Sequence, residues 1–196
     1  MKYYLEITLI DSEDESLYFI WSKLYAQLHL ALVEVKKHND KSNIGVSFPE
    51  YRFNPEKGIG FLGTKLRVFA NSEEELQTLN IVTWLARLSD YIHITSIREV
   101  PVHKITGYAI FSRKQVKTNA SRLARHRIKR GDINFDEAVA RYQNIVTRSD
   151  LPFIQLNSLT NKHQFRLFIQ KANQSEMCSG TFTSYGLSYG ATVPEF

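Results

Sequence analysis

Residues 3–37 read YYLEITLIDSEDESLYFIWSKLYAQLHLALVEVKK, and this stretch decides the fold. Its first part, Tyr3–Ile10, alternates apolar and polar side chains, a pattern that predicts a strand with one buried face. From Ser16 to about Lys37 apolar residues recur at helical spacing, which predicts a long amphipathic helix. They are Leu17, Ile20, Trp21, Leu24, Leu28, Ala31, Leu32 and Val35. A strand that leads into a helix of this length begins a β-α-β-β-α-β order.

The rest of that order follows within the first hundred residues. Ser72 followed by Glu75 is a capping box, which starts the second helix. The stretch Pro49–Gly63 joins the two middle strands. Its Gly58–Gly63 part matches G-x-G-x-x-G, but a strand follows it, so we interpret it as a hairpin loop and not as a nucleotide site. The predicted elements are strands at Ile44–Phe48, Thr64–Ala70 and Tyr91–Ile97 and a helix from Ser72 to about Ala86. This is the ferredoxin-like arrangement, which many RNA-binding and RNA-processing modules share.

The two halves of the chain differ in charge. Residues 1–100 hold 11 basic and 14 acidic side chains, whereas residues 101–196 hold 14 basic and 6 acidic ones. The change falls at Glu99–Pro101, where the proline interrupts any strand or helix. We therefore expect an α+β protein with a ferredoxin-like domain over 1–100 and a second α+β domain over 101–196, although the length also suits one large domain. In the second half we expect strands at Thr106–Arg113, Leu151–Leu156, Gln164–Gln170 and Thr181–Gly186, with a helix that begins at Asn134.

The segment Phe111–Arg130, FSRKQVKTNASRLARHRIKR, contains eight Lys or Arg and no acidic residue. Good helix formers fill it from about residue 119 and Gly131 follows it, so we expect an arginine-rich helix over about 119–130. At about 100° per residue, five of its basic side chains fall on one side. These side chains are Arg122, Arg125, His126, Lys129 and Arg130. Solvated helices usually interleave Glu with Lys, so the lack of acids favours nucleic-acid or phosphate binding over a merely solvated face.

The remaining composition bears on the compartment of the protein and on whether it binds a metal ion or another cofactor. A single cysteine, Cys178, excludes an internal disulfide, and the start of the chain does not have the pattern of a signal peptide, so we expect a cytoplasmic protein. No run of apolar residues is long enough to span a membrane. None of the six histidines belongs to a helix-borne metal motif and acidic residues are sparse in the second half, so we expect no metal and no other cofactor.

If the protein cuts nucleic acid without a metal ion, its substrate is expected to be RNA, whose own 2′-OH attacks the adjacent phosphate once a base removes its proton. His29 is the candidate for that base because it borders the apolar face of the first helix, beside Tyr25 and Ser22. From position alone, a structural or solvated histidine is an equally good interpretation.

Six short segments occur along the chain: LHLALV (Leu28–Val33), IGVSFP (Ile44–Pro49), SRKQ (Ser112–Gln115), LPFI (Leu151–Ile154), FRLFI (Phe165–Ile169) and FTSYGLS (Phe182–Ser188). In this order they resemble the CRISPR repeat-RNA endoribonuclease family of the type I-F systems. The resemblance spans essentially the whole chain, and six ordered motifs are far more specific than any one of them.

The resemblance implies catalytic roles for three residues. His29 corresponds to the family's general base, Ser158 to the serine that holds the attacking ribose, and Tyr185 to the tyrosine that helps arrange the site. Such a set suits attack by the 2′-OH, which leaves a 2′,3′-cyclic phosphate and a 5′-hydroxyl without a metal ion. A positioned base typically contributes about 10²–10⁴-fold to the rate.

The resemblance also implies how RNA is recognised. Arg113 and Gln115 read base edges near the foot of the repeat hairpin, a chemistry that suits guanine and adenine. Phe165 stacks beneath the last base pair, and the arginine-rich helix enters the groove of the stem. Where the family has arginines, this chain has His126 and Lys129. Lysine keeps the charge but loses the bidentate fork, and neutral histidine loses the charge as well.

The resulting hypothesis is a metal-independent endoribonuclease that binds the hairpin of CRISPR repeat RNA, cuts at its 3′ base and stays on the mature guide RNA. Its implied partners are that RNA and other subunits of the type I-F surveillance complex; it is expected to be monomeric on its own and to bind no membrane. The alternative is a non-catalytic RNA-binding subunit that caps the 3′ hairpin of the guide. A DNA-binding protein with a groove helix is a third hypothesis.

Overall fold

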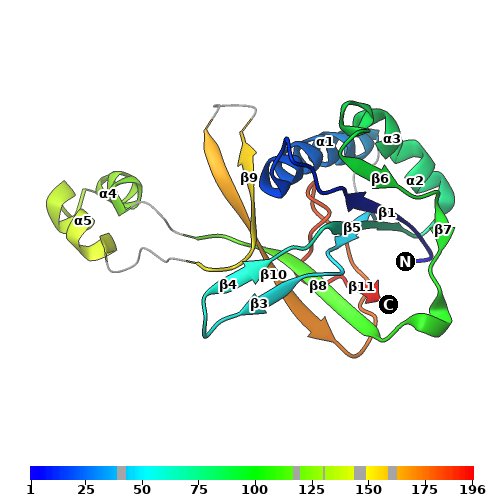
Figure 1. The fold of residues 1–196 in the computed structure, drawn as a ribbon. Coiled ribbons are helices and arrows are strands. Elements are labelled where there is room, and N and C mark those ends of the chain that lie inside the picture. Colours follow the sequence, from blue (N-terminus) through cyan, green and yellow to red (C-terminus); the bar gives the residue numbers. More distant parts are fainter. Residues whose placement is uncertain (39–42, 117–119, 130, 144–148, 159–162) are drawn as a thin grey trace. The chain divides into compact units, whose positions relative to one another are not determined.

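The structure, a computed structural model, describes residues 1–38, 43–116, 120–129, 131–143, 149–158 and 163–196 (Figure 1). The chain forms two compact units, one of residues 1–113 with 151–196 and the other of residues 114–150. Each unit is described by itself. Within the described ranges, no helix combines the length and the apolar character needed to cross a membrane.

The first unit contains an antiparallel sheet in the order β2-β5-β1-β6 (Figure 1). A short fifth strand, β7, also pairs with the central strand β1. This order is that of the predicted ferredoxin-like β-α-β-β-α-β arrangement. The expected closing strand Tyr91–Ile97 is shortened to β6, and β7 begins one residue after its predicted end. The strands are β1 (Tyr3–Leu9), β2 (Gly45–Ser47), β5 (Lys65–Ala70), β6 (Ile92–Ile94) and β7 (Arg98–Glu99).

The long helix α1 (Leu17–His38) forms as predicted and buries its apolar stripe. Leu24, Leu28 and Leu32 follow one another at four-residue spacing and are fully buried. This spacing places side chains on one helix face, so α1 contributes a continuous ridge to the core. The indole N–H of Trp21 donates to the carbonyl of Gly63 at 2.9 Å, which ties the first half of the helix to the loop before β5.

The second helix, α2 (Glu73–Leu79), is shorter than predicted. Its capping box is confirmed, because the Ser72 hydroxyl accepts from the Glu75 N–H while the Glu75 carboxylate accepts from the Ser72 N–H. The helix ends at Asn80, whose φ of 44° is left-handed, a conformation that Asn tolerates better than most residues. Helical turns resume as α3 (Ile81–Trp84) and η1 (Ala86–Leu88), so the single helix expected up to Ala86 is wrong.

A second sheet in the first unit has the order β11-β8-β10-β9. Its core is continuous with that of the first sheet, since the rings of Phe48 and Phe111 lie 5.4 Å apart. The two compact units therefore have other bounds than the predicted domains 1–100 and 101–196. That these two ranges are separate domains stays a prediction. The strands are β8 (Gly107–Lys114), β9 (Phe153–Asn157), β10 (Gln164–Gln174) and β11 (Val193–Glu195), with a short 3-10 helix, η2 (Val102–Lys104), before them.

Of two segments outside the main sheets, one forms as predicted and the other does not. The predicted hairpin around Gly58–Gly63 is present, and it contains two paired strands, β3 (Arg52–Asn54) and β4 (Ile59–Phe61). The predicted strand Thr181–Gly186 is wrong, because this segment forms a turn in which only Phe182 makes an isolated bridge. The φ of Gly186 is +68°, which is incompatible with continued extended backbone.

The second unit is a pair of helices, α4 (Ala120–Ile128) and α5 (Phe135–Gln143). Two alanines, Ala124 on α4 and Ala138 on α5, are fully buried, which indicates close packing between the helices. Asn134 caps α5 as predicted, because its side-chain oxygen accepts from the N–H of Glu137 at 2.9 Å.

Candidate active site

His29 lies on α1, half-buried, at the edge of the apolar stripe where the sequence placed it. Its Nδ1 atom is 2.8 Å from the carbonyl oxygen of Ser184, which is 155 residues away in the chain. A carbonyl oxygen only accepts hydrogen bonds, so Nδ1 must carry the proton in this contact. In the neutral ring the lone pair is then on Nε2. The geometry therefore presents His29 as a base through Nε2.

The ring of Tyr185 stacks on the ring of His29. Their centroids are 4.2 Å apart and their planes differ by 5°. Tyr185 is on the turn that follows Phe182, so the same turn supplies the carbonyl that orients Nδ1 and the ring that covers one face of the imidazole. Two contacts at right angles to each other, one in the ring plane and one above it, hold the imidazole in one orientation.

Arg113 and Phe165 extend this cluster. The guanidinium carbon of Arg113, near the end of β8, lies 5.8 Å from the Tyr185 ring centroid and 5.4 Å from the Phe165 ring centroid. Cations favour the faces of aromatic rings at such distances. The structure therefore brings four predicted site residues together in a row: His29, Tyr185, Arg113 and Phe165. They come from α1, a turn, β8 and β10.

Ser158, the third predicted catalytic residue, comes one residue after β9. Its N–H donates to the carbonyl of His163 at 2.8 Å, and this bond joins the residue after β9 to the residue before β10. The strand β9 packs against α1, where the hydroxyl of Ser22 donates to the carbonyl of Gln155. Ser158 thus directly follows a strand that is anchored to the helix carrying His29, but no contact among those described for the chain joins Ser158 to His29 or Tyr185.

The other predicted RNA-binding residues belong to the second unit. The described side chains of Gln115, Arg125, His126 and Lys129 are all exposed. The side chain of Arg122 and the whole of Arg130 lie outside the described residues. Because the two units are described separately, the structure does not place this set relative to the His29 cluster.

Arg127, the neighbour of this exposed set, is engaged differently. Its guanidinium bonds to the carboxylate of Asp132, just beyond the end of α4. This contact neutralises Arg127 locally, so the exposed cations described for residues 120–129 are Arg125, on α4, and Lys129, just after it. Asp132 lies two residues beyond the acid-free segment and was not part of the predicted helix.

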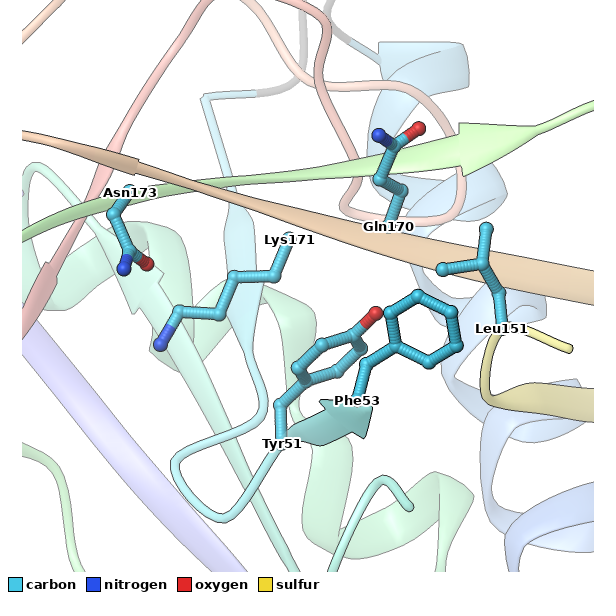
Figure 2. Close-up of a pocket in the computed structure, with 6 residues that line it drawn as sticks. All are labelled: Tyr51, Phe53, Leu151, Gln170, Lys171 and Asn173. Atoms are coloured by element: carbon cyan, nitrogen blue, oxygen red, sulfur yellow. The ribbon is translucent and has the colours of Figure 1, made fainter. Parts of the chain in front are cut away.

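A hollow of about 350 Å³ lies elsewhere in the first unit, beside β3 and β10 (Figure 2). Tyr51 and Phe53 provide its aromatic wall, and the phenol of Tyr51 donates to the carbonyl of Ile169 at 3.0 Å. None of the residues that line it belongs to the predicted site. They are Tyr51, Phe53, Leu151, Gln170, Lys171 and Asn173. Among the described residues no group of three or more His, Cys, Asp or Glu side chains is placed to hold a metal ion.

Two residues at the site were missed by sequence reasoning. Ser184 contributes through its backbone carbonyl, which every residue type has, so the sequence carried no signal for it. Tyr25 was identified only as a neighbour of His29, yet its hydroxyl donates to the carbonyl of Tyr185 at 2.8 Å. Its position four residues before His29, on the same helix face, is the signal that could have found it.

Comparison of the sequence with known proteins identifies its family. The family model for a CRISPR-associated protein (Cas_Csy4) matches residues 4–196. A relative from Escherichia coli (strain UTI89 / UPEC), named CRISPR-associated endonuclease Cas6/Csy4, is 35% identical over 198 residues, and the alignment covers 100% of both chains. One of the same name from Pseudomonas aeruginosa (strain UCBPP-PA14) is 37% identical with the same coverage.

A solved structure from a study of a Cas6-related gene of Pyrococcus furiosus is 14% identical, with a TM-score of 0.37, and covers 99% of this chain and 98% of that one. The full-length sequence matches include α1 with His29, the turn at residues 183–187 and the helices α4 and α5. On their strength, the chain belongs to the Csy4 family of CRISPR-associated proteins.

Proposed function

We propose that this protein is an endoribonuclease that processes CRISPR repeat RNA. Both relatives are named CRISPR-associated endonucleases, and they match this chain from end to end. The observation that carries the proposal is the His29 contact, in which the Ser184 carbonyl holds the proton on Nδ1 and leaves Nε2 as the free base.

His29 Nε2 takes the proton of the ribose 2′-OH at the cut site. The 2′-oxygen then bonds to the adjacent phosphorus, and the bond from phosphorus to the 5′-oxygen breaks. That oxygen takes a proton from water, and His29 returns its own proton to the solvent, so no net proton is gained or lost. The products are a 2′,3′-cyclic phosphate and a 5′-hydroxyl, and the step needs no metal ion. Tyr185 keeps the imidazole plane in place through the stack, while Ser158 holds the ribose from the end of β9.

Recognition of the RNA is shared between the two units. In the first, Arg113 presents its guanidinium to the faces of Phe165 and Tyr185, which leaves its N–H edge for a base, and Phe165 provides a flat surface for the end of a stem. In the second, Gln115 reads a base edge. The arginine-rich segment, which comprises α4 and the two residues after it, contacts phosphates through Arg122, Arg125, His126, Lys129 and Arg130. The mature guide RNA stays bound, and other subunits of the surveillance complex assemble around it.

The test is a cleavage assay with purified protein, a labelled repeat hairpin and EDTA throughout, followed by mass analysis of the product ends. We expect one cut at the 3′ base of the hairpin and a 2′,3′-cyclic phosphate. Replacing the single 2′-OH at the cut site with hydrogen should abolish cutting and leave binding intact.

The decisive variant is His29→Asn, because the Asn amide can still donate to the Ser184 carbonyl but offers no base at the Nε2 position. We expect a loss of about 10²–10⁴-fold in the cleavage rate. The matched control is His93→Asn, on the exposed face of β6, which should cut normally. Cutting by His29→Asn at the rate of the unmodified protein would remove His29 from the mechanism. Tight binding without any cut would instead identify a subunit that only caps the guide.

A further inference from the structure

Three successive carbonyl groups of one turn accept hydrogen bonds from three donors, two on α1 and one on β2. In residues 184–186, the first carbonyl accepts from His29 Nδ1 at 2.8 Å and the second from the hydroxyl of Tyr25 at 2.8 Å. The third accepts from the backbone N–H of Val46 at 3.0 Å. A displacement of this turn along α1 therefore changes all three bonds together.

The turn itself is closed by its own backbone. The N–H of Thr183 donates to the carbonyl of Leu187 at 2.8 Å, and the N–H of Gly186 donates to the carbonyl of Thr183 at 2.9 Å. Gly186 has a φ of +68°, and a Cβ there would lie 2.6 Å from Val46 Cγ1. The turn is thus internally compact, so its position on α1 depends on the external donors.

Tyr25 is the donor best able to hold that position. Its side chain is fully buried, and its ring stacks on Phe48 with centroids 6.1 Å apart. Burial raises the pKa of the Tyr25 phenol far above its ordinary value, so the hydroxyl remains a hydrogen-bond donor at any working pH. Removing the hydroxyl would leave the partly buried carbonyl of Tyr185 without this partner, which is unfavourable.

Tyr25 and His29 are four residues apart on α1, so they lie one above the other on one helix face. They donate to adjacent carbonyls of the same turn. We infer that Tyr25 is a positioning residue: by holding the Tyr185 carbonyl, it keeps the Ser184 carbonyl against His29 Nδ1 and thereby maintains the tautomer with a free Nε2. This inference rests on the proposed role of His29 as the base.

The test compares two variants that each remove one phenolic hydroxyl donating to a backbone carbonyl. Tyr25→Phe removes the bond to Tyr185 and keeps the buried ring. Tyr51→Phe removes the bond to the carbonyl of Ile169, beside the hollow in Figure 2, and serves as the matched control. Thermal unfolding of both proteins shows that they are folded and whether the two losses are comparable.

The first readout is single-turnover cleavage of repeat RNA, with the dissociation constant measured separately. For Tyr25→Phe we expect the cleavage rate to fall about three- to tenfold, the range that one net hydrogen bond supports, with unchanged RNA affinity. Tyr51→Phe should cut at the unmodified rate. Equal rates for the two variants would overturn the inference.

The second readout is the tautomer of His29, observed by long-range ¹⁵N–¹H NMR correlation on the full chain without RNA. We expect the Nδ1–H form in the unmodified protein and in Tyr51→Phe, and a mixture of forms in Tyr25→Phe. An unchanged tautomer in Tyr25→Phe refutes the inference, whatever the rates. If the unmodified protein does not cut RNA at all, the proposed function fails, and the NMR result alone decides the role of Tyr25.

Discussion

Gly186→Ala is the sharpest test of how the turn at residues 183–187 is fixed. The substitution has two separable costs. A left-handed φ of +68° costs an alanine about 1–2 kcal/mol relative to glycine. The new Cβ would also lie 2.6 Å from Val46 Cγ1, and overpacking of this kind costs about 1–3 kcal/mol. We therefore expect a total loss of about 2–5 kcal/mol in the free energy of unfolding.

A double-mutant cycle with Val46→Ala separates the two costs. Val46 is buried, so truncating it alone should cost about 2 kcal/mol for two lost methyl groups. In the double variant the overlap disappears while the strained φ remains. The pair should thus be less destabilised than the sum of the single variants, by about 1–3 kcal/mol.

The assay is urea unfolding followed by circular dichroism. The dependence of the unfolding free energy on urea concentration is measured separately for each variant. Gly190→Ala is the control, because a Cβ at Gly190 meets no atom within 4 Å, and it should change stability by less than about 0.5 kcal/mol. An additive cycle, with a coupling below about 0.5 kcal/mol, would refute the contact between the turn and Val46 as the source of the cost.

Three further results are expected. Lys129→Ala should lower the slope of log K against log salt for repeat RNA by about 0.7–0.9, measured by fluorescence anisotropy; an unchanged slope would place the phosphate elsewhere. Ser72→Ala should destabilise the protein by about 1 kcal/mol in urea, since it removes half of a capping box, and no change would mean that the helix does not need its cap. Bonds from Thr64, the backbone N–H above all, hold the pKa of Glu50 below its ordinary 4.5, so Glu50 stabilises the fold above that pH and loses this effect as pH falls through the folded-state pKa. Glu50→Gln should therefore lower the unfolding temperature more at pH 7 than at pH 3, and an equal difference at both values would contradict the assignment.

The elements that sequence predicted well are those with a local cause. The strand β1 and the helix α1 follow directly from apolar spacing of two and of three to four, and the capping box at Ser72 and Glu75 is a four-residue pattern. Failures occurred where tertiary contacts decide. The alternation around Phe182 suggests a strand, but the left-handed Gly186 and the donors on α1 and β2 convert the segment into a turn.

The site itself was predictable only in part from the residues. His29 could be identified as a histidine at the border of the core, because helix geometry places it there. Its partner carbonyl and the stacked Tyr185 lie more than 150 positions away, and no periodicity connects them. Family resemblance supplied that link. The hydrogen bond of the Tyr25 hydroxyl could not be predicted from the sequence, because a fully buried aromatic residue on a helix has the same sequence pattern as an ordinary core residue.

The chain's two halves contribute different parts of the proposed active site. The base comes from α1, in the first hundred residues, whereas its orienting carbonyl, its stacked ring and its neighbouring guanidinium come from the second half. These groups meet because the sheet of β8–β11 shares one core with the sheet of β1, β2, β5, β6 and β7. A fragment of residues 1–100 would keep His29 but lose both contacts that orient it. The charge change at Pro101 therefore marks a change in the surface and not the edge of a self-contained site.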